Sequence, residues 1–317
     1  MSKLSIGGQA VLEGVMMKNT DKYAIAVRKP DNEIEVKVTE YEQIGDKIKF
    51  FRLPIIRGVV NFIESMVIGV KTLTYSADLL EECEEKMEAD IEDACKKEGA
   101  KKEKDSQKSD SIMMFFTVAL SIAIAIGLFM LLPAFITGLI KNSVKNHFLL
   151  GLIEGVIRLV IFILYVYLIS LMKDIKRTYM YHGAEHKTIN CLESLQDLTV
   201  ENVKKHSRFH KRCGTSFLFI VMFVSILVFM CITAETMIMR LLLRLLLVPV
   251  IAGISYEFIR FAGKSDSALA NILSKPGLWV QRMTTVEPDD GMIEVAIKSV
   301  EGVLDWKKYI EEQKDNG

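Results

Sequence analysis

The segment IMMFFTVALSIAIAIGLFMLLPAFITGLI, residues Ile112 to Ile140, contains no charged side chain. An α-helix needs about 20 apolar residues to cross the hydrocarbon core of a bilayer, and this segment is longer than that. Three further apolar blocks follow it, at Phe148–Met172, Thr215–Thr233 and Leu241–Phe261. The sequence therefore predicts a mainly α-helical, polytopic membrane protein whose four transmembrane helices are surrounded by the lipid bilayer.

The distribution of charge predicts an orientation. The 317 residues include 40 basic and 40 acidic side chains, a balance that indicates no nucleic-acid partner. Basic residues are concentrated at 173–214 and at 101–108, whereas the first short loop has only Lys141 and Lys145. Because basic loops stay on the inner side, we expect a multi-pass protein of the cytoplasmic membrane with both termini and loop 173–214 in the cytoplasm. Arg244, near one end of the fourth apolar block, is expected to snorkel.

The region before the first apolar block is polar, begins with no charged-then-apolar leader and predicts no cleavable signal peptide. Alternating apolar and polar residues over 23–41, interrupted by Pro30-Asp31-Asn32, predict two strands and a turn. The glycines at positions 7, 8 and 14 predict tight turns. Residues 53–77 predict an amphipathic helix. It either lies on the membrane surface or against the transmembrane helices, or it packs under the β element.

Composition divides the chain into four expected regions. They are an N-terminal cytoplasmic region with the β-hairpin and the amphipathic helix (1–77), a charged helical tether (78–111), a four-helix transmembrane domain with its cytoplasmic loop 173–214 (112–263), and a C-terminal cytoplasmic segment (264–317).

Metal chemistry is suggested by the run Tyr181-His182-Gly183-Ala184-Glu185-His186. Two imidazoles four residues apart on a helix project from one face at a separation that suits one metal ion. In the inverted zincin pattern H-x-x-E-H the two histidines hold zinc and the glutamate activates water as a general base. His182 and His186 are therefore candidate ligands and Glu185 is a candidate base, the alternative being two solvated histidines at a helix end.

A second cluster of ligand-type residues precedes the third apolar block. His206, His210 and Cys213 are spaced four and three apart, which predicts one helical face, and imidazole and thiolate are both zinc ligands. We take His210 and Cys213 as candidate ligands of a divalent metal, zinc above all, with a lipid-headgroup contact as the alternative. Glu257 is a further candidate ligand, because an intramembrane acid is a functional candidate; its alternative role is to neutralise Arg260.

Several segments resemble the YqhQ-like bacterial membrane proteins, a family of unknown function described as predicted metal-dependent enzymes. The matching residues are Gly7 to Met17, Arg57-Gly58-Val59 with Glu64-Ser65, Tyr181 to Lys187, His210 to Ser216, Arg260 to Gly263, Pro276 to Trp279 with Gln281, and Thr284 to Asp290. The resemblance implies an integral membrane protein, and the family's metal label falls on His182, Glu185, His186, His210 and Cys213. It implies no reaction.

Three function classes follow from these residues. The first is a metal-dependent hydrolase of a peptide or lipid-linked substrate at the cytoplasmic membrane surface, with an open coordination position. The second is a non-catalytic membrane scaffold or biogenesis factor, in which four protein ligands close a structural site. The third, a small-solute transporter, is disfavoured because the apolar blocks contain few polar positions. Protein partners and the substrate are not indicated by the sequence.

Overall fold

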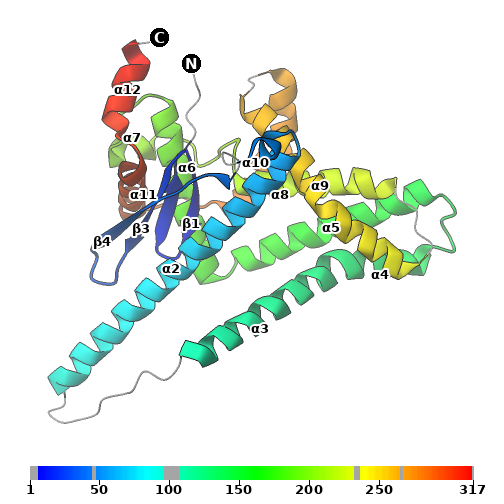
Figure 1. The fold of residues 1–317 in the computed structure, drawn as a ribbon, viewed down its shortest axis with the longest axis horizontal. Coiled ribbons are helices and arrows are strands. Elements are labelled where there is room, and N and C mark those ends of the chain that lie inside the picture. The colour runs from blue at the N-terminus through cyan, green and yellow to red at the C-terminus, as the bar shows by residue number, and fades with distance from the viewer. Residues whose placement is uncertain (1–5, 45–47, 96–106, 232–235, 265–266, 316–317) are drawn as a thin grey trace. The chain divides into compact units, whose positions relative to one another are not determined.

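The computed structural model describes residues 6–44, 48–95, 107–231, 236–264 and 267–315. Within these ranges the chain is mainly helical and contains a four-stranded antiparallel sheet near its N-terminus, which confirms the mainly α-helical class and the small N-terminal β region that the sequence predicted (Figure 1). Two compact units are assembled from separate stretches of sequence. The first comprises Met1–Glu84, Val166–Val224 and Val248–Gly317, and the second comprises Glu85–Tyr165 and Ser225–Leu247.

The sheet has the strand order β1-β2-β3-β4, with the strands at Gly7–Val11, Gly14–Lys18, Lys22–Arg28 and Ile34–Glu40. Strands β3 and β4 confirm the predicted hairpin. The prediction of turns at the first glycines was wrong for Gly7 and Gly8, which begin β1, whereas Gly14, which begins β2, directly follows a two-residue turn at Leu12-Glu13. Gly14 meets a packing need, because an added Cβ would lie 2.3 Å from the carbonyl oxygen of Ala26.

Both faces of the sheet are covered within the first unit. Met17 and Ala24 belong to a core with the helices α6 (Lys173–Glu193), α11 (Asp290–Val303) and α12 (Trp306–Asp315) and the short helix α7 (Val200–Lys204). Met16 and Ile25, which alternate with them, face the helix α2 (Ile56–Cys95). Two-residue periodicity in β2 and β3 therefore holds α6 and α2 on opposite sides of one sheet.

Helix α2 packs under the sheet through Ile68 and Leu80, so one face of the predicted amphipathic helix follows the alternative in which it lies beneath the β element. It also has an apolar face that nothing in the described chain covers, where Ile63, Met66 and Val70 are more than half exposed. The helix continues to Cys95 into the expected tether, and residues 96–106 of that tether lie outside the described residues.

Among the described residues, three helices are long and apolar enough to cross a membrane, at Phe116–Ile140, His147–Ser170 and Leu241–Ala262. They belong to α3 (Gln107–Ile126) with the π-helical turn η2 (Gly127–Leu131) and α4 (Leu132–Ile140), to α5 (His147–Ser170), and to α9 (Met237–Lys264). Three of the four predicted spans thus correspond to helices with the length and composition of a membrane span. The remaining apolar block forms α8 (Gly214–Met230), whose 17 residues extend about 25 Å against the ~30 Å of a bilayer core.

The second unit contains a buried charge cluster. Glu154 of α5 pairs with Arg158 at 3.2 Å, and its Oε1 also lies 2.5 Å from Nη1 of Arg244. Arg158 Nε donates to the carbonyl oxygen of Phe129 in η2 at 3.0 Å. The expectation that Arg244 would snorkel was wrong, since its side chain is 8% exposed and is directed to an acid inside the unit.

The other described elements are a 3-10 turn, η1 (Lys49–Arg52), and α10 (Ala268–Thr284). The segment after α10 passes along α6, where Val286 N donates to the carbonyl oxygen of Tyr179 at 2.9 Å. Gly183 permits this approach, because an added Cβ would lie 2.1 Å from the carbonyl oxygen of Val286. The end of α10 is thereby placed beside the histidines of α6.

Candidate metal centre

The histidine motif lies in the middle of α6, as its spacing predicted. The rings of His182 and His186 have their centroids 4.4 Å apart, one turn of helix from each other. Tyr181 and Ala184 face the core of the first unit and fix the rotation of the helix. His186 is 1% exposed and His182 is half-buried, so neither is the solvated histidine of the alternative interpretation.

Backbone carbonyl groups orient both imidazoles. His182 Nδ1 lies 2.8 Å from the oxygen of Thr284, and His186 Nδ1 lies 2.7 Å from the oxygen of Arg208. A carbonyl oxygen can only accept, so each Nδ1 must carry a proton, and when the ring is neutral its lone pair is on Nε2, the atom that would bind a metal. This arrangement matches metal-ligating histidines, whose other ring nitrogen usually donates to a carbonyl or carboxylate.

Cys213 completes a group of three ligand atoms. Its Sγ lies 3.3 Å from His182 Nε2, and the ligand atoms of His182, His186 and Cys213 all lie within 4.8 Å of one another. Tetrahedral zinc bonds of about 2.3 Å to sulfur and 2.0 Å to nitrogen place these atoms about 3.5 Å apart. The donor types and their spacing therefore fit a divalent metal of the zinc type.

The surroundings of Cys213 favour a thiolate. Burial raises the pKa of the Cys213 thiol, but the charges of His182 and His186 and their hydrogen bonds lower it by more, so the pKa is well below its usual range. Thr215 adds its backbone N–H at 3.4 Å and its hydroxyl at 3.1 Å. Burial alone would lower the pKa of His182, but Cys213 and Glu185 raise it to about 9. Thiolate is the form of cysteine that binds metals.

Glu185 is 5% exposed, and among the described residues it makes no hydrogen bond or ion pair. Burial raises the pKa of Glu185, and the neighbouring His186 and His182 oppose that shift. Its side chain packs against β1, where a Cβ added to Gly8 would lie 2.9 Å from Glu185 Cγ. An acid without a partner beside three ligand atoms is available to handle a proton.

The structure separates His210 from this group. Its Nε2 lies 3.3 Å from Glu193, its Nδ1 accepts the backbone N–H of Arg212 at 3.4 Å, and its ring centroid is 5.8 Å from that of His186. The predicted helical face through His206, His210 and Cys213 was wrong, because α7 ends at Lys204 and α8 begins at Gly214. The connecting segment is not helical, so residues three or four apart in it do not share one face.

Glu257 is also placed elsewhere. Its carboxylate accepts two hydrogen bonds from the guanidinium group of Arg57 at the start of α2, one of them at 2.5 Å from Nε. The expected neutralising partner was Arg260, three residues along the same helix. Among the described residues, the group that could hold an ion consists of His182, His186 and Cys213.

Sequence reasoning missed the residues that hold the ligands. Thr284 and Arg208 act through backbone oxygens, and Gln281 fixes the segment before Cys213 by accepting from His210 N at 2.9 Å and donating to its carbonyl oxygen at 2.8 Å. Every residue carries a backbone carbonyl, so the sequence does not show which carbonyls orient the imidazoles. Gln281 and Thr284 did lie within the segments of family resemblance, although that gave them no role.

Comparison with known proteins places the chain in a family. Residues 53–306 match the family described as "Protein of unknown function (DUF1385)", and the chain belongs to that family. It is 33% identical over 305 residues to "Uncharacterized protein YqhQ" of Bacillus subtilis (strain 168), an alignment that covers 94% of this chain and 92% of that protein. No solved structure matches the chain.

Proposed function

We propose that this member of the DUF1385 family is an integral membrane, metal-dependent hydrolase with its site at the cytoplasmic surface. His182, His186 and Cys213 would hold a divalent ion, with zinc as the best fit to one thiolate and two imidazoles. The observation that carries the proposal is the convergence of three ligand atoms while both Nδ1 atoms are held by backbone carbonyls.

The number of ligands supports an enzyme over a scaffold. Structural zinc sites close with four protein ligands, whereas catalytic sites keep three and leave one position open. His210, the fourth ligand that a closed site would need, has its ring nitrogens directed to Glu193 and to the Arg212 N–H. Three ligands beside a buried acid therefore favour the catalytic alternative.

The chemistry would be divided between the ion and Glu185. A divalent ion in such a site supplies a Lewis acid that polarises a substrate carbonyl or phosphoryl oxygen. Glu185 would take a proton from the attacking water and return it to the leaving group. The carbonyls of Thr284 and Arg208 would keep the imidazoles fixed while this happens. A peptide or lipid-linked substrate suits a site beside the bilayer.

A second candidate, a cysteine hydrolase without a metal, is favoured by one contact. Cys213 Sγ is within hydrogen-bond reach of His182 Nε2, and His182 is oriented by Thr284, which is the arrangement of a nucleophile, its base and an orienting group. Cys213 also directly precedes α8, where a helix N-terminus stabilises a thiolate. It ranks second because a nucleophile needs only one base, which leaves His186 unexplained.

The shared core supports the proposed topology. Strands of the N-terminal region, α6 and α11 pack in one core, so these three parts must lie on the same side of any membrane. In the sequence, α3 to α5 lie between the sheet and α6. In this topology α3 and α4 together would cross the membrane and α5 would return. Helices α8 and α9 lie between α6 and α11 in the chain, so they would have to bring the chain back to the same side of the membrane. Either α8 and α9 each cross the membrane, with α8 as a short span, or together they form a hairpin that enters the membrane and turns back. The basic residues of 173–214 favour the cytoplasm for this side.

Metal content of the full-length protein, purified in a neutral detergent, tests the proposal. We expect about one zinc per chain in the wild type and in Glu185→Gln, and loss of zinc in the double variant His182→Ala/His186→Ala. The control is His147→Ala, an exposed histidine at the start of α5. Undiminished zinc in the double variant, or a metal-free wild type after zinc supplementation, contradicts the metal site; a metal-free wild type leaves the cysteine hydrolase as the better candidate.

The role of Glu185 is tested in cells that lack the chromosomal gene. A glutamine keeps the volume of the side chain but cannot accept a proton, so we expect Glu185→Gln to fail in complementation at normal protein abundance. The scaffold alternative expects it to complement. Complementation by Glu185→Gln together with failure of the histidine double variant would replace the hydrolase with a structural metal site.

A further inference from the structure

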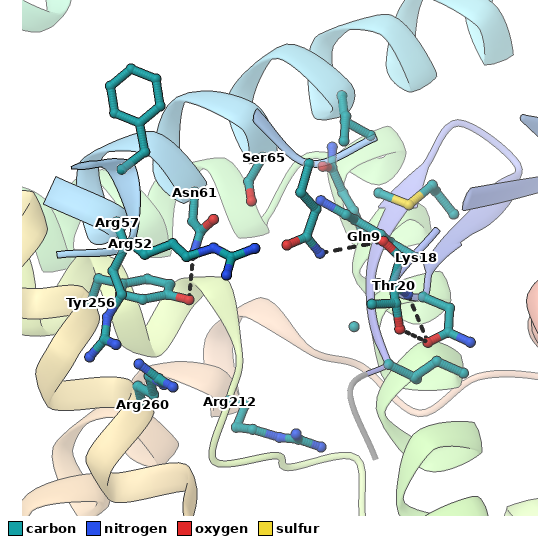
Figure 2. Close-up of a pocket in the computed structure, with 18 residues that line it drawn as sticks. Gln9, Lys18, Thr20, Arg52, Arg57, Asn61, Ser65, Arg212, Tyr256 and Arg260 are labelled. Atoms are coloured by element: carbon teal, nitrogen blue, oxygen red, sulfur yellow. Dashed lines mark hydrogen bonds between the residues drawn. The ribbon is translucent and has the colours of Figure 1, made fainter. Parts of the chain in front are cut away.

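A cavity of about 740 Å³ in the first unit is lined by cations. Its walls come from β1, β2, η1, the start of α2, the end of α9 and the segment before Cys213 (Figure 2). Five of the residues that line it are basic, and none of its described lining residues is acidic. These five are Lys18, Arg52, Arg57, Arg212 and Arg260.

Part of this charge is uncompensated. Arg57 is paired with Glu257, and Arg212 is paired with Glu193. Lys18 and Arg260 form no ion pair within 4.0 Å with any residue that the structure describes; the charge of Arg260 acts on Glu257 at longer range and helps to lower the pKa of that carboxyl, and the Lys18 ammonium lies 4.0 Å from the ring centroid of Tyr41. Burial lowers the pKa of Lys18, which shows that its charge is desolvated without a close acid, although Glu64 at longer range opposes the shift. Such a lining attracts an anion.

The polar groups between the cations suit phosphate. Guanidinium groups bind phosphate oxygens in a bidentate manner, and Asn61 and Ser65 add neutral groups from the pocket-facing side of α2. Figure 2 shows Arg52, Arg57 and Arg260 on one side of the cavity and Lys18 with Gln9 on the other, so that an anion between them could meet both. Asn61 Nδ2 donates to the Tyr256 hydroxyl at 2.7 Å and fixes this wall.

The size of the cavity indicates more than a bare ion. Water occupies about 30 Å³ per molecule in the liquid, so the cavity has roughly 25 times that volume and a lone phosphate would leave most of it empty. Ligand sites for small organic molecules are commonly 300 to 1,000 Å³, about the size of this one. A phosphate joined to a glycerol or a similar headgroup fits better.

The position of the cavity points to the membrane as the source. Tyr256 and Arg260 lie in the last turns of the apolar helix Leu241–Ala262, the level at which a span leaves the hydrocarbon. Arg57, Asn61 and Ser65 recur every four residues on one face of α2, whereas the exposed Ile63 and Val70 lie on another. A helix with polar residues on one face and exposed apolar residues on another is suited to a bilayer interface, where anionic lipids supply headgroup phosphates.

We propose that this cationic pocket binds the phosphate-bearing headgroup of an anionic membrane lipid. The proposal does not depend on a metal at His182 and His186, and it can hold if the hydrolase proposal fails. Should both hold, a lipid would be bound next to the candidate metal centre, because Gly8 lines the pocket and also packs against Glu185.

Titration of the full-length protein in neutral detergent with short-chain phosphatidic acid, read by native mass spectrometry, tests the pocket. We expect Lys18→Gln and Arg260→Gln each to weaken binding about 5-fold, the effect of one basic residue on an anionic lipid. Ser65→Glu adds a carboxylate at an exposed lining position, needs no change in the fold and should weaken binding by at least as much. The matched control is Lys71→Gln, an exposed cation of α2 outside the pocket.

Equal losses in Lys71→Gln and in the pocket variants would mean general surface attraction and would overturn the proposal. So would wild-type affinity in Ser65→Glu with an unchanged melting temperature. A parallel titration with inorganic phosphate distinguishes the source of the anion. We expect it to bind at least 10-fold more weakly than phosphatidic acid; equal affinity would overturn the lipid and leave a site for free phosphate.

Discussion

Gly183→Ala tests how the candidate metal centre is held, without touching a ligand. A Cβ at this position would lie 2.1 Å from the carbonyl oxygen of Val286 and 3.4 Å from Cδ of Pro288. Carbon and oxygen normally approach to about 3.3 Å, so α6 and the segment after α10 must separate by roughly 1 Å. Overpacking of this kind destabilises a protein by about 1–3 kcal/mol.

The separation acts on His182, the residue before Gly183. Its Nδ1 lies 2.8 Å from the Thr284 oxygen, and an increase of about 1 Å takes this contact beyond the ~3.2 Å range of a hydrogen bond. Loss of such an outer partner reduces metal affinity by about 10- to 100-fold. We therefore expect zinc affinity to fall by that factor, with the three ligands still present.

Competition with a chelator of known zinc affinity measures this loss. Gly214→Ala is the matched control, because it follows Cys213 directly and its added Cβ would meet nothing within 4 Å. We expect the control to bind zinc as the wild type does. Wild-type affinity in Gly183→Ala would refute the role of the Thr284 carbonyl, and an equal loss in Gly214→Ala would show that the effect does not come from the contact with Val286.

Three further expectations concern charges away from the metal centre. Glu154→Gln leaves two buried cations without their acid and should destabilise the second unit by about 3–5 kcal/mol in unfolding by sodium dodecyl sulfate, and adding Arg244→Leu should restore part of the loss. Glu257→Gln should leave zinc content unchanged and lower stability by about 1 kcal/mol or less, because Glu257 pairs with the half-buried Arg57; loss of zinc would restore Glu257 as a ligand. A single cysteine at Lys145 should react with an impermeant thiol reagent from outside the cell, and labelling only from the cytoplasm would reverse the proposed topology.

The elements that the sequence predicts best are those with a strong local period. The apolar blocks gave the helices α3 to α5 and α9, and alternation with a Pro-Asp-Asn turn gave β3 and β4. Strands β1 and β2 were missed because their glycines suggested turns. In the structure Gly14 is required by the carbonyl oxygen of Ala26 on the neighbouring strand, a tertiary reason that the local sequence cannot express.

Charged residues in apolar helices were harder to interpret, since their partners are distant in sequence. Arg57 and Glu257 are separated by 200 positions, and Glu154 reaches Arg244 of another helix. Reasoning from neighbours three or four residues away found only the pair Glu154 and Arg158. A buried charge requires a counter-charge, but the local sequence does not show which residue supplies that counter-charge.

The candidate metal centre combines residues that a local sequence period reveals with residues that are distant in sequence. Two ligands, His182 and His186, share one helical face and are visible as a motif, whereas Cys213 joins them from a segment without regular structure. The groups that orient the imidazoles lie 102 residues after His182 and 22 residues after His186, and both are backbone oxygens. A side-chain pattern can therefore nominate ligands, but the orientation that makes them a site depends on how closely α6 meets its neighbours. Gly183 sets that distance for His182, which is why a residue with no ligand atom is expected to control the affinity for the metal.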